Sequence, residues 1–350
     1  MQPKITKLEK SRIEIEGEIP EAEFKTFETK AIEHLLANFE MPGFRKGKVP
    51  VDVFRKQIGD MPILEEMAEL AMAKHYPEIL ESEKIDAIGR PEIMITKLAK
   101  DNPLGFKIRT AVLPELTLPD YKKIATEAFS KEVKAEVTEK EVDDAILEFR
   151  KMRAHQELHK DDTSESHEHN HPELTEEALP PFDDTFAQAV GNFKTADELK
   201  EKIRENILLE KKNKEEEKKR IAAVEKIIDG VKVDVPEILI EAELNKMFHR
   251  MESDISNMGL NMDDYLKHVK KTKESLREEW RKDAERRAIL ELTLNKIAQV
   301  ENITVPKENI DTEVKKLMDM YKDADPLQAE LYVENILRNE KVFSFLEGLK

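Results

Sequence analysis

The sequence contains no cysteine and few glycines, and both shortages exclude classes of function. Without cysteine among its 350 residues, the chain can form no disulfide, no thiolate nucleophile and no cysteine-bound metal site. Its 10 glycines offer little material for loops that surround phosphate groups, and neither GxxxxGK[ST] nor GxGxxG occurs. No GxSxG motif places a serine for nucleophilic attack. We therefore predict no catalytic residues and no nucleotide cofactor.

Long apolar runs are also absent. No stretch approaches the roughly 18 apolar residues that a membrane-spanning helix requires. The first ten residues, MQPKITKLEK, lack the apolar segment of a secretory signal. Charged side chains make up 38% of the residues, and the formal net charge is −17. We expect a cytoplasmic protein that has no membrane partner and exposes much solvated surface.

The pattern of residues 1–113 predicts an α+β domain with a small antiparallel sheet. Ile13, Ile15 and Ile19 alternate with charged residues, as in a strand with one buried face. Further strands are predicted at residues 92–99 and 105–113, and a helix at residues 51–82. A helix over residues 20–39 has an apolar face made by Phe24, Phe27, Ala31, Leu35 and Phe39.

The rest of the chain predicts a connector followed by an elongated all-α arm domain. Residues 114–136 contain two prolines near their start and are predicted to be an extended linker. Residues 137–158 form the first arm helix, and residues 179–350 continue the helical domain. Glu210–Arg220 has no apolar side chain, so this part of a long helix should lie in solvent and not in a core.

Two short sequence features refine this division. Thr138 and Glu141 have the spacing of a capping box at the start of the first arm helix. Gln156–Thr185 contains ten Asp or Glu against one Lys, and we predict that residues 159–178 are an acidic linker. The histidines in and beside this segment could bind a divalent metal, but isolated imidazoles lack the fixed geometry of a site, so we predict none. They are His155, His159, His167, His169 and His171.

One loop concentrates positive charge in this acidic chain. Between Met41 and Val51 there is no carboxylate, while Arg45, Lys46 and Lys48 are all cationic. Pro42, Gly43 and Gly47 shape the backbone, and Arg55 and Lys56 follow. On the residues alone, the cluster is either ordinary solvated surface or a polyanion contact in which Phe44 adds an apolar side chain.

This loop also carries a resemblance. PGFRKGKVP, from Pro42 to Pro50, resembles the ribosome-binding signature of the trigger factor family of bacterial chaperones. LPDYK, from Leu118 to Lys122, resembles the family's linker, and the charged helices from Leu179 onward resemble its arm domain. The resemblance implies an ATP-independent chaperone that docks at the nascent-chain exit and shields apolar segments of newly made proteins.

The resemblance assigns residues and partners to this function. It implies contact with a ribosomal protein beside the exit tunnel and with adjacent rRNA, besides unfolded or nascent polypeptides, and homodimerisation away from the ribosome. No cofactor is implied. The implied ribosome-binding residues are Gly43, Phe44, Arg45, Lys46, Gly47 and Lys48.

One departure from the family pattern is large. Members usually have an FKBP-like peptidyl-prolyl isomerase domain between the first arm helix and the rest of the arm. Here no Phe, Tyr or Trp occurs from Arg150 to Pro181, so an aromatic-walled prolyl pocket cannot be built there. We expect a chaperone that is not an enzyme.

The residues that would contact client proteins are less defined. Methionines and phenylalanines recur at helical spacing in the arm, where they either pack a core or form an adaptable apolar surface. The candidates are Met247, Phe248, Met251, Met258, Met262, Met318, Met320, Phe343 and Phe345. Two other functions stay open: a ribosome-assembly or RNA-binding factor that uses the same loop, and a cytosolic holdase that does not bind ribosomes.

Overall fold

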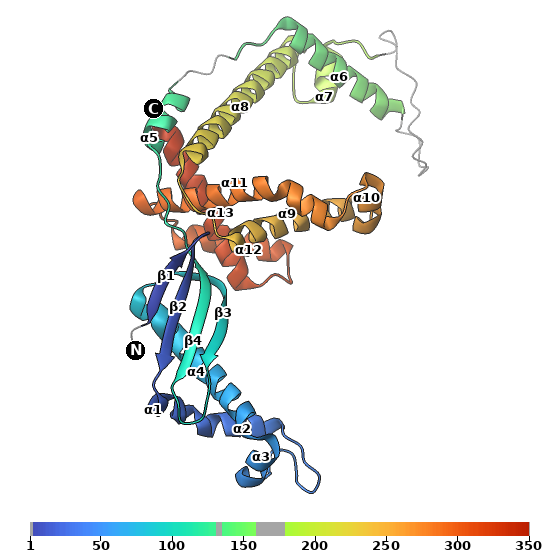
Figure 1. Cartoon of the computed structure of the whole chain (residues 1–350). Helices are drawn as coiled ribbons and strands as arrows, with labels where there is room; N and C mark the ends of the chain where they lie inside the picture. The colour runs from blue at the N-terminus through green and yellow to red at the C-terminus, as the bar shows by residue number, and fades with distance from the viewer. Residues whose placement is uncertain (1–2, 131–134, 159–178, 350) are drawn as a thin grey trace. The chain divides into compact units, whose positions relative to one another are not determined.

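The computed structural model describes residues 3–130, 135–158 and 179–349 (Figure 1). The chain divides into two compact units, each made of two segments. The first unit comprises Met1–Pro119 and Ile228–Asn339, and the second comprises Asp120–Ile227 and Glu340–Lys350. The predicted acidic linker, residues 159–178, lies outside the described residues.

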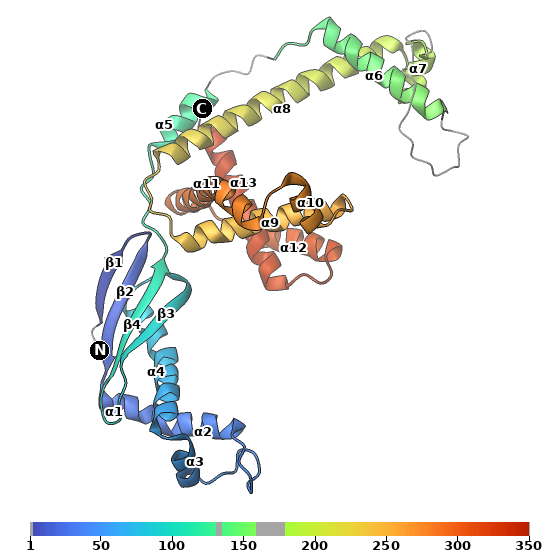
Figure 2. The same cartoon turned by 45° about the vertical axis from the view of Figure 1, so that its right-hand side comes forward.

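The first unit begins with a four-stranded antiparallel sheet of order β1-β2-β4-β3 (Figure 2). Ile13 and Ile15 of β2 lie opposite Thr110 and Ile108 of β4, and all four side chains are buried. The strands are β1 (Lys4–Leu8), β2 (Arg12–Ile19), β3 (Ala87–Lys97) and β4 (Leu104–Val112). The predicted α+β fold class is confirmed, although β1 was not predicted because almost none of its surface is buried.

Short helices and one long helix complete this domain. The helix predicted over residues 51–82 is two helices, since Gly59 between them takes a φ of +78° that L-residues rarely adopt. The long helix α4 lies along one face of the sheet (Figure 1). The helices are α1 (Glu21–Phe24), a 3₁₀ turn (Lys25–Phe27), α2 (Glu28–Asn38), α3 (Val51–Ile58) and α4 (Asp60–Glu83).

The segment predicted to be an extended connector, residues 114–136, contains a helix. Thr117 pairs with Lys232 in an isolated antiparallel bridge, and no helix forms before Asp120. The helix α5 (Tyr121–Phe129) then begins inside the segment expected to be extended. A local interaction favours the start of α5 at this point. The carboxylate of Asp120 accepts a hydrogen bond from the backbone N–H of Lys123 and so caps the helix.

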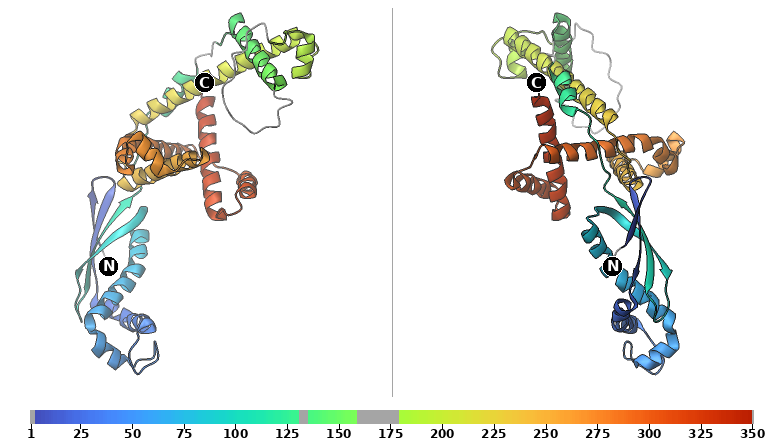
Figure 3. Two further views of the ribbon diagram at one scale, coloured as in Figure 1. Left: turned by 90° about the vertical axis from the view of Figure 1, so that its right-hand side faces the viewer. Right: turned by 60° about the vertical axis from the view of Figure 1, so that its left-hand side comes forward.

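The C-terminal part of the first unit is helical. Helices α9 and α11 pack side by side (Figure 3). Leu244 of α9 is buried together with Ala284 and Ala288 of α11. Small alanine side chains let the two helix backbones approach closely. The helices are α9 (Glu237–Asn257), α10 (Met262–Val269), α11 (Lys273–Val300), α12 (Lys307–Met320) and α13 (Pro326–Gly348), whose last turns belong to the second unit.

The second unit contains α6 (Glu139–Leu158), α7 (Asp184–Val190) and α8 (Ala196–Gly230). Its core is small and includes Val142, Ile146, Phe186, Leu199 and Ile203. The predicted capping box is confirmed: Glu141 accepts a hydrogen bond from the N–H of Thr138 at 2.9 Å, and Thr138 Oγ1 accepts from the N–H of Glu141 at 3.4 Å. No residue of the polar segment 210–220 of α8 is buried, also as predicted.

Candidate functional site

The basic loop between α2 and α3 is built from two tight turns. The N–H of Phe44 donates to the carbonyl of Met41 at 3.1 Å, with Pro42 and Gly43 at the two central positions. Gly43 has a φ of +90°, which matches the type II turn that Pro-Gly favours. In the second turn the N–H of Lys48 donates to the carbonyl of Arg45 at 2.9 Å, and Gly47 has a φ of +72°. Both glycines are therefore required by backbone conformation.

Both ends of the loop are fixed to the domain core. Phe39, at the end of α2, packs edge-to-face on Phe54 with ring centroids 4.9 Å apart. Val49 is buried in the same hydrophobic cluster as Phe54. The N–H of Gly47 donates to the carbonyl of Phe39 at 3.3 Å, so the second turn is tied back to the end of α2. The loop therefore projects from the domain, and both of its ends are held against the hydrophobic core.

The exposed part of the loop presents one aromatic ring and three cations. Phe44 is 43% exposed, so its ring lies at the surface and not in the nearby core. Arg45 and Lys48 are exposed and form no ion pair with any described residue, while Lys46 Nζ lies 3.3 Å from a carboxylate oxygen of Glu40. This arrangement suits an anionic partner that also offers an apolar contact.

Arg55, which follows the loop in α3, is paired with carboxylates of described residues, unlike Arg45 and Lys48. Arg55 forms an ion pair with Glu28 of α2 and lies 3.9 Å from Asp60 at the start of α4. It therefore ties α3 to its neighbours and contributes no free charge to the loop. The structure separates it from Arg45, Lys46 and Lys48, with which the sequence groups it.

The candidate client residues of α9 and α10 divide into packed and exposed side chains. Met247 packs against the core between α9 and α11, as ordinary core packing predicts. Phe248 lies on Trp280 with ring centroids 4.9 Å apart, and the Arg277 guanidinium lies 5.5 Å from its ring. Met251 and Met262 are half-buried, and Met258 is exposed where α9 ends.

The remaining candidates lie in two different units. Met318 is half-buried on α12, and Met320 is 72% exposed at its end. Phe343 and Phe345 belong to the second unit and are half-buried. Arg220 lies 5.9 Å from the ring of Phe343, and Lys122 lies 5.9 Å from the ring of Phe345. The predicted client residues are thus divided between the two units, with the methionines and Phe248 in the first and these two phenylalanines in the second.

Sequence reasoning named Met320 but missed four other exposed apolar side chains around the end of α12 and the start of α13. We call these five residues the hairpin patch, and each side chain is more than half exposed. Leu327 and Leu331 are one helical turn apart on α13, so they lie on one face. The sequence places apolar residues on all sides of α13. Their periodicity alone does not show which side of the helix packs against the rest of the protein and which side is exposed. The hairpin patch consists of Met320, Tyr321, Leu327, Leu331 and Tyr332.

A groove of about 920 Å³ also lies in the first unit. Residues 113–116 line one side, and the C-terminal half of α11 with the following residues lines the other. Asn295 Oδ1 and Arg338 Nε are buried here without a hydrogen-bond partner among the described residues. The groove therefore combines apolar walls with lining residues that carry buried polar atoms. Its apolar lining includes Leu113, Leu116, Leu292, Ile303 and Val305.

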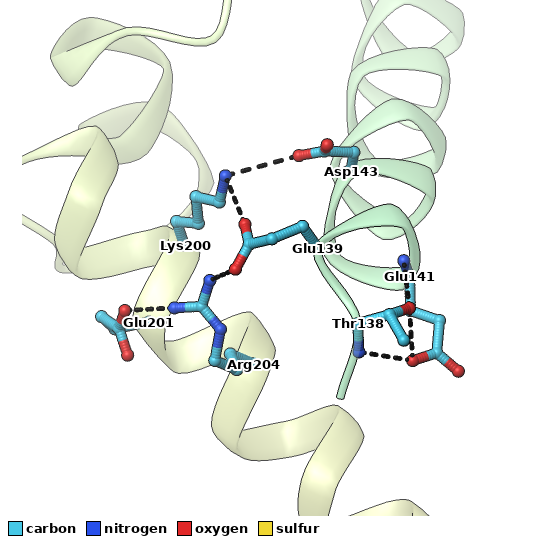
Figure 4. A network of polar contacts seen from close by, with 7 residues as sticks. All are labelled: Thr138, Glu139, Glu141, Asp143, Lys200, Glu201 and Arg204. Carbon is cyan, nitrogen blue, oxygen red and sulfur yellow. Dashed lines mark hydrogen bonds and ion pairs between the residues drawn. The ribbon is translucent and has the colours of Figure 1, made fainter. Parts of the chain in front are cut away.

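Ion pairs fasten α6 to α8 in the second unit (Figure 4). Lys200 lies 3.2 Å from Glu139 and 3.4 Å from Asp143, and Arg204 pairs with both Glu139 and Glu201. Lys200 and then Arg204 lower the pKa of Glu139. This pattern is that of a structural network on exposed helices, because each charge meets an opposite charge.

Glu141, beside this network, has the most clearly shifted pKa. Lys211 Nζ lies 2.5 Å from its carboxylate, and the N–H and O–H of Thr138 donate to it. These contacts, the one to Lys211 foremost, lower the pKa of Glu141 to about 2. The carboxylate is thus held ionised, the opposite of what a general acid at neutral pH needs.

Two structural features are absent from the described residues. In that part of the chain, no three His, Cys, Asp or Glu side chains gather to hold a metal ion. Most of the histidines considered above lie outside it. No helix found there is both long and apolar enough to cross a membrane.

Comparison with known proteins decides the family. Residues 1–149 match the family model described as bacterial trigger factor protein, and residues 195–347 match the model of the bacterial trigger factor C-terminus. The chain belongs to the trigger factor family. The predictions of a trigger factor and of a ribosome-associated chaperone are thereby confirmed. Trigger factors bind ribosomes and nascent chains.

Individual relatives agree with this assignment. The trigger factor of Shouchella clausii is 28% identical over 84% of this chain and 83% of its own length. That of Moorella thermoacetica is 25% identical over 97% of this chain and 91% of its own length. That of Pelotomaculum thermopropionicum is 25% identical over 100% of this chain and 94% of its own length.

A solved structure shares the fold. It is described as "Promiscuous Substrate Recognition in Folding and Assembly Activities of the Trigger Factor Chaperone". It matches with a TM-score of 0.59 and 18% sequence identity, and the match covers 100% of both chains. At this identity the likeness supports the fold.

Proposed function

We propose that this trigger factor docks on the ribosome through Phe44, Arg45 and Lys46, with Lys48 as an auxiliary cation. The exposed double turn supports the proposal, because Gly43 and Gly47 hold an aromatic ring and unpaired positive charge away from the domain core. The partners would be a ribosomal protein beside the nascent-chain exit and the adjacent rRNA.

The chemistry of each side chain suits a different part of this contact. The Arg45 guanidinium can donate two parallel hydrogen bonds to a carboxylate or phosphate, whereas Lys46 acts as a point charge. Lys46 must leave Glu40 to do so, and an exposed pair of this kind is worth only about 0–1 kcal/mol. Phe44 would bury its ring in an apolar crevice of the partner.

Client proteins would contact the helical part of the first unit. The hairpin patch and the groove lined by residues 113–116 offer apolar surface in separate places, so binding would be shallow and distributed. Among the client-binding residues predicted from the sequence, Met258 and Met320 are the most exposed and therefore the best supported. Release would then follow from folding of the client, without nucleotide hydrolysis.

We infer that this member is not a prolyl isomerase. Residues 150–194 lie between the two family-model matches, and no aromatic residue occurs from Arg150 to Pro181. The alignment to the Pelotomaculum relative extends over 418 residues while this chain has 350, so that relative contains residues with no counterpart here. We also propose domain boundaries at residues 113, 136, 158 and 178. The protein would be located in the cytoplasm and would form a homodimer.

Ribosome co-sedimentation over a salt series tests the loop. The variant has Phe44→Ala, Arg45→Ala and Lys46→Ala, and the matched control replaces two exposed lysines elsewhere in the domain, Lys4→Ala and Lys30→Ala. Loss of two phosphate contacts should reduce the slope of log affinity against log salt by about 1.4–1.8. Equal sedimentation of both folded variants would reject the loop as the contact.

A refolding assay tests the client surface independently. Leu327→Asp with Leu331→Asp should weaken suppression of light scattering by an aggregating client, with ribosome binding unchanged. The matched control, Leu209→Asp with Ile221→Asp, places the same charges on exposed positions of α8. If the two double variants suppress aggregation equally well, the hairpin patch has no special role. Ribosome binding without any aggregation suppression by the wild type would instead favour an assembly or RNA-binding factor.

A further inference from the structure

The sheet of the first unit is wider than the helix that covers it. Four strands spaced about 4.8 Å apart exceed the roughly 10 Å diameter of a single helix such as α4. Ile93 and Ile95 of β3 lie opposite Ile108 and Phe106 of β4, whose side chains are buried. Directly opposed residues share a face, so Ile93 and Ile95 also face the α4 side. Nevertheless Ile93 is 44% exposed.

The uncovered strip forms a groove of about 660 Å³ between α4 and β3. We call it the β3 groove. Its floor is apolar, and β3 is an edge strand with β4 as its one partner among the described strands. Half of the backbone N–H and C=O groups of an edge strand point away from the sheet and can pair with another strand. The floor consists of Ala68, Met72, Tyr76, Ile93, Ile95 and Leu98.

The rim of the β3 groove is negatively charged. Glu65 and Glu69 are one helical turn apart on α4, and both line the groove. Both are exposed, and neither forms an ion pair or a side-chain hydrogen bond with a described residue. Two unpaired carboxylates beside an apolar floor select against anionic ligands and favour a nearby cation.

We propose that the β3 groove binds an extended apolar segment of a client chain, flanked by lysine or arginine, as an additional strand beside β3. Backbone hydrogen bonds to the strand edge give affinity that depends little on sequence, while alternate side chains enter the groove. Lysine or arginine beside the segment meets Glu65 and Glu69. The proposal rests on the proposed chaperone function and adds to it a binding site and a mode of binding.

A second copy of this chain fits the groove less well. Two copies joined edge to edge would bring two rims of unpaired carboxylates into one interface between chains of net charge −17. A basic client segment removes this repulsion. The occupant is therefore a client segment.

Cross-linking with a synthetic peptide tests the site in the full chain. The probe alternates valine with threonine, has lysine at both ends and includes a photoreactive benzophenone. One comparison peptide carries glutamate in place of lysine at both ends. The other carries N-methyl groups on its backbone. The cross-link should map to residues 65–98, and both comparison peptides should bind more weakly than the probe.

Variants separate the groove from the opposite face of the same strand. Ile93→Asp should weaken probe binding about tenfold, comparable to losing one buried apolar side chain. Met94→Asp is the matched control, because Met94 is 58% exposed and its neighbours on the strand alternate in direction. Glu65→Lys with Glu69→Lys should reverse the preference to glutamate-ended peptide. Circular dichroism establishes that each variant is folded.

Several outcomes would overturn the proposal. Cross-links confined to residues 228–347, equal binding by Ile93→Asp and Met94→Asp, or no effect of N-methylation would each do so. Dissociation of a dimer by Ile93→Asp without any peptide cross-link would assign the groove to a second copy. The ribosome and aggregation assays report on the proposed function separately, because Ile93→Asp leaves the basic loop and the hairpin patch unchanged.

Discussion

Gly43→Ala tests the loop without removing any charge or aromatic ring. Gly43 has a φ of +90°, and no atom lies within 4 Å of a Cβ built at this position. The substitution therefore adds backbone strain without a clash. Placing an L-residue in left-handed backbone costs about 1–2 kcal/mol. At about 1.4 kcal/mol per factor of ten, this equals a change of about 5- to 30-fold in an equilibrium constant.

This strain should change either the ribosome Kd or the free energy of unfolding, depending on whether the turn opens in the free protein. If the exposed turn opens in the free protein, the ribosome Kd from co-sedimentation rises by about 5- to 30-fold and urea unfolding is unchanged, because binding must re-form the turn. If the turn holds, the free energy of unfolding falls by about 1–2 kcal/mol and the Kd is unchanged.

Gly59→Ala is the matched control for this prediction. Gly59 also has a positive φ and free space around it, but it lies between α3 and α4, outside the loop. It should lower the free energy of unfolding and leave the ribosome Kd unchanged. If Gly43→Ala alters neither quantity, the turn geometry described above is not what presents Phe44 and Arg45.

Two further predictions concern stability. The pKa of Glu141 is lowered from 4.5 to about 2, so its stabilising contribution is complete above about pH 4.5 and is lost as pH falls toward about 2. Hydrogen exchange at the start of α6 should thus be faster in Glu141→Gln than in the wild type at pH 5, and the difference should shrink as pH falls through about 2. Phe54→Ala should lower the free energy of unfolding by about 3–5 kcal/mol in urea titrations, since Phe54 is 1% exposed. Val51→Ala, exposed on the same helix, should cost less than about 0.5 kcal/mol, and similar losses for the two would contradict the packing argument.

Local signals in the sequence predicted those parts of the fold that local chemistry determines. Strand β2 follows from the alternation of Ile13 and Ile15, and the start of α6 follows from Thr138 and Glu141. Pro42-Gly43 and the glycine at 47 likewise predicted a shaped loop, because each residue type has a specific backbone preference.

Features that depend on distant neighbours were not predictable in this way. Strand β1 has almost no buried residue, so no alternation marks it, and it exists because its backbone pairs with β2. The hairpin patch and the β3 groove are apolar segments that resemble core in the sequence. Only the tertiary arrangement shows that nothing among the described residues covers Leu331 or Ile93 fully.

The packing of both ends of the basic loop on the core also determines how the domain responds to a protease. Trypsin cuts after lysine and arginine, and Arg45, Lys46 and Lys48 are exposed between two ends that pack on the domain core. A cut there separates β1, β2 and α2 from α3, α4, β3 and β4, yet one hydrophobic cluster contains residues from both fragments. The nicked domain should therefore remain associated and folded. A bound ribosome would shield the bond from cleavage, which makes the rate of nicking an unlabelled reporter of occupancy.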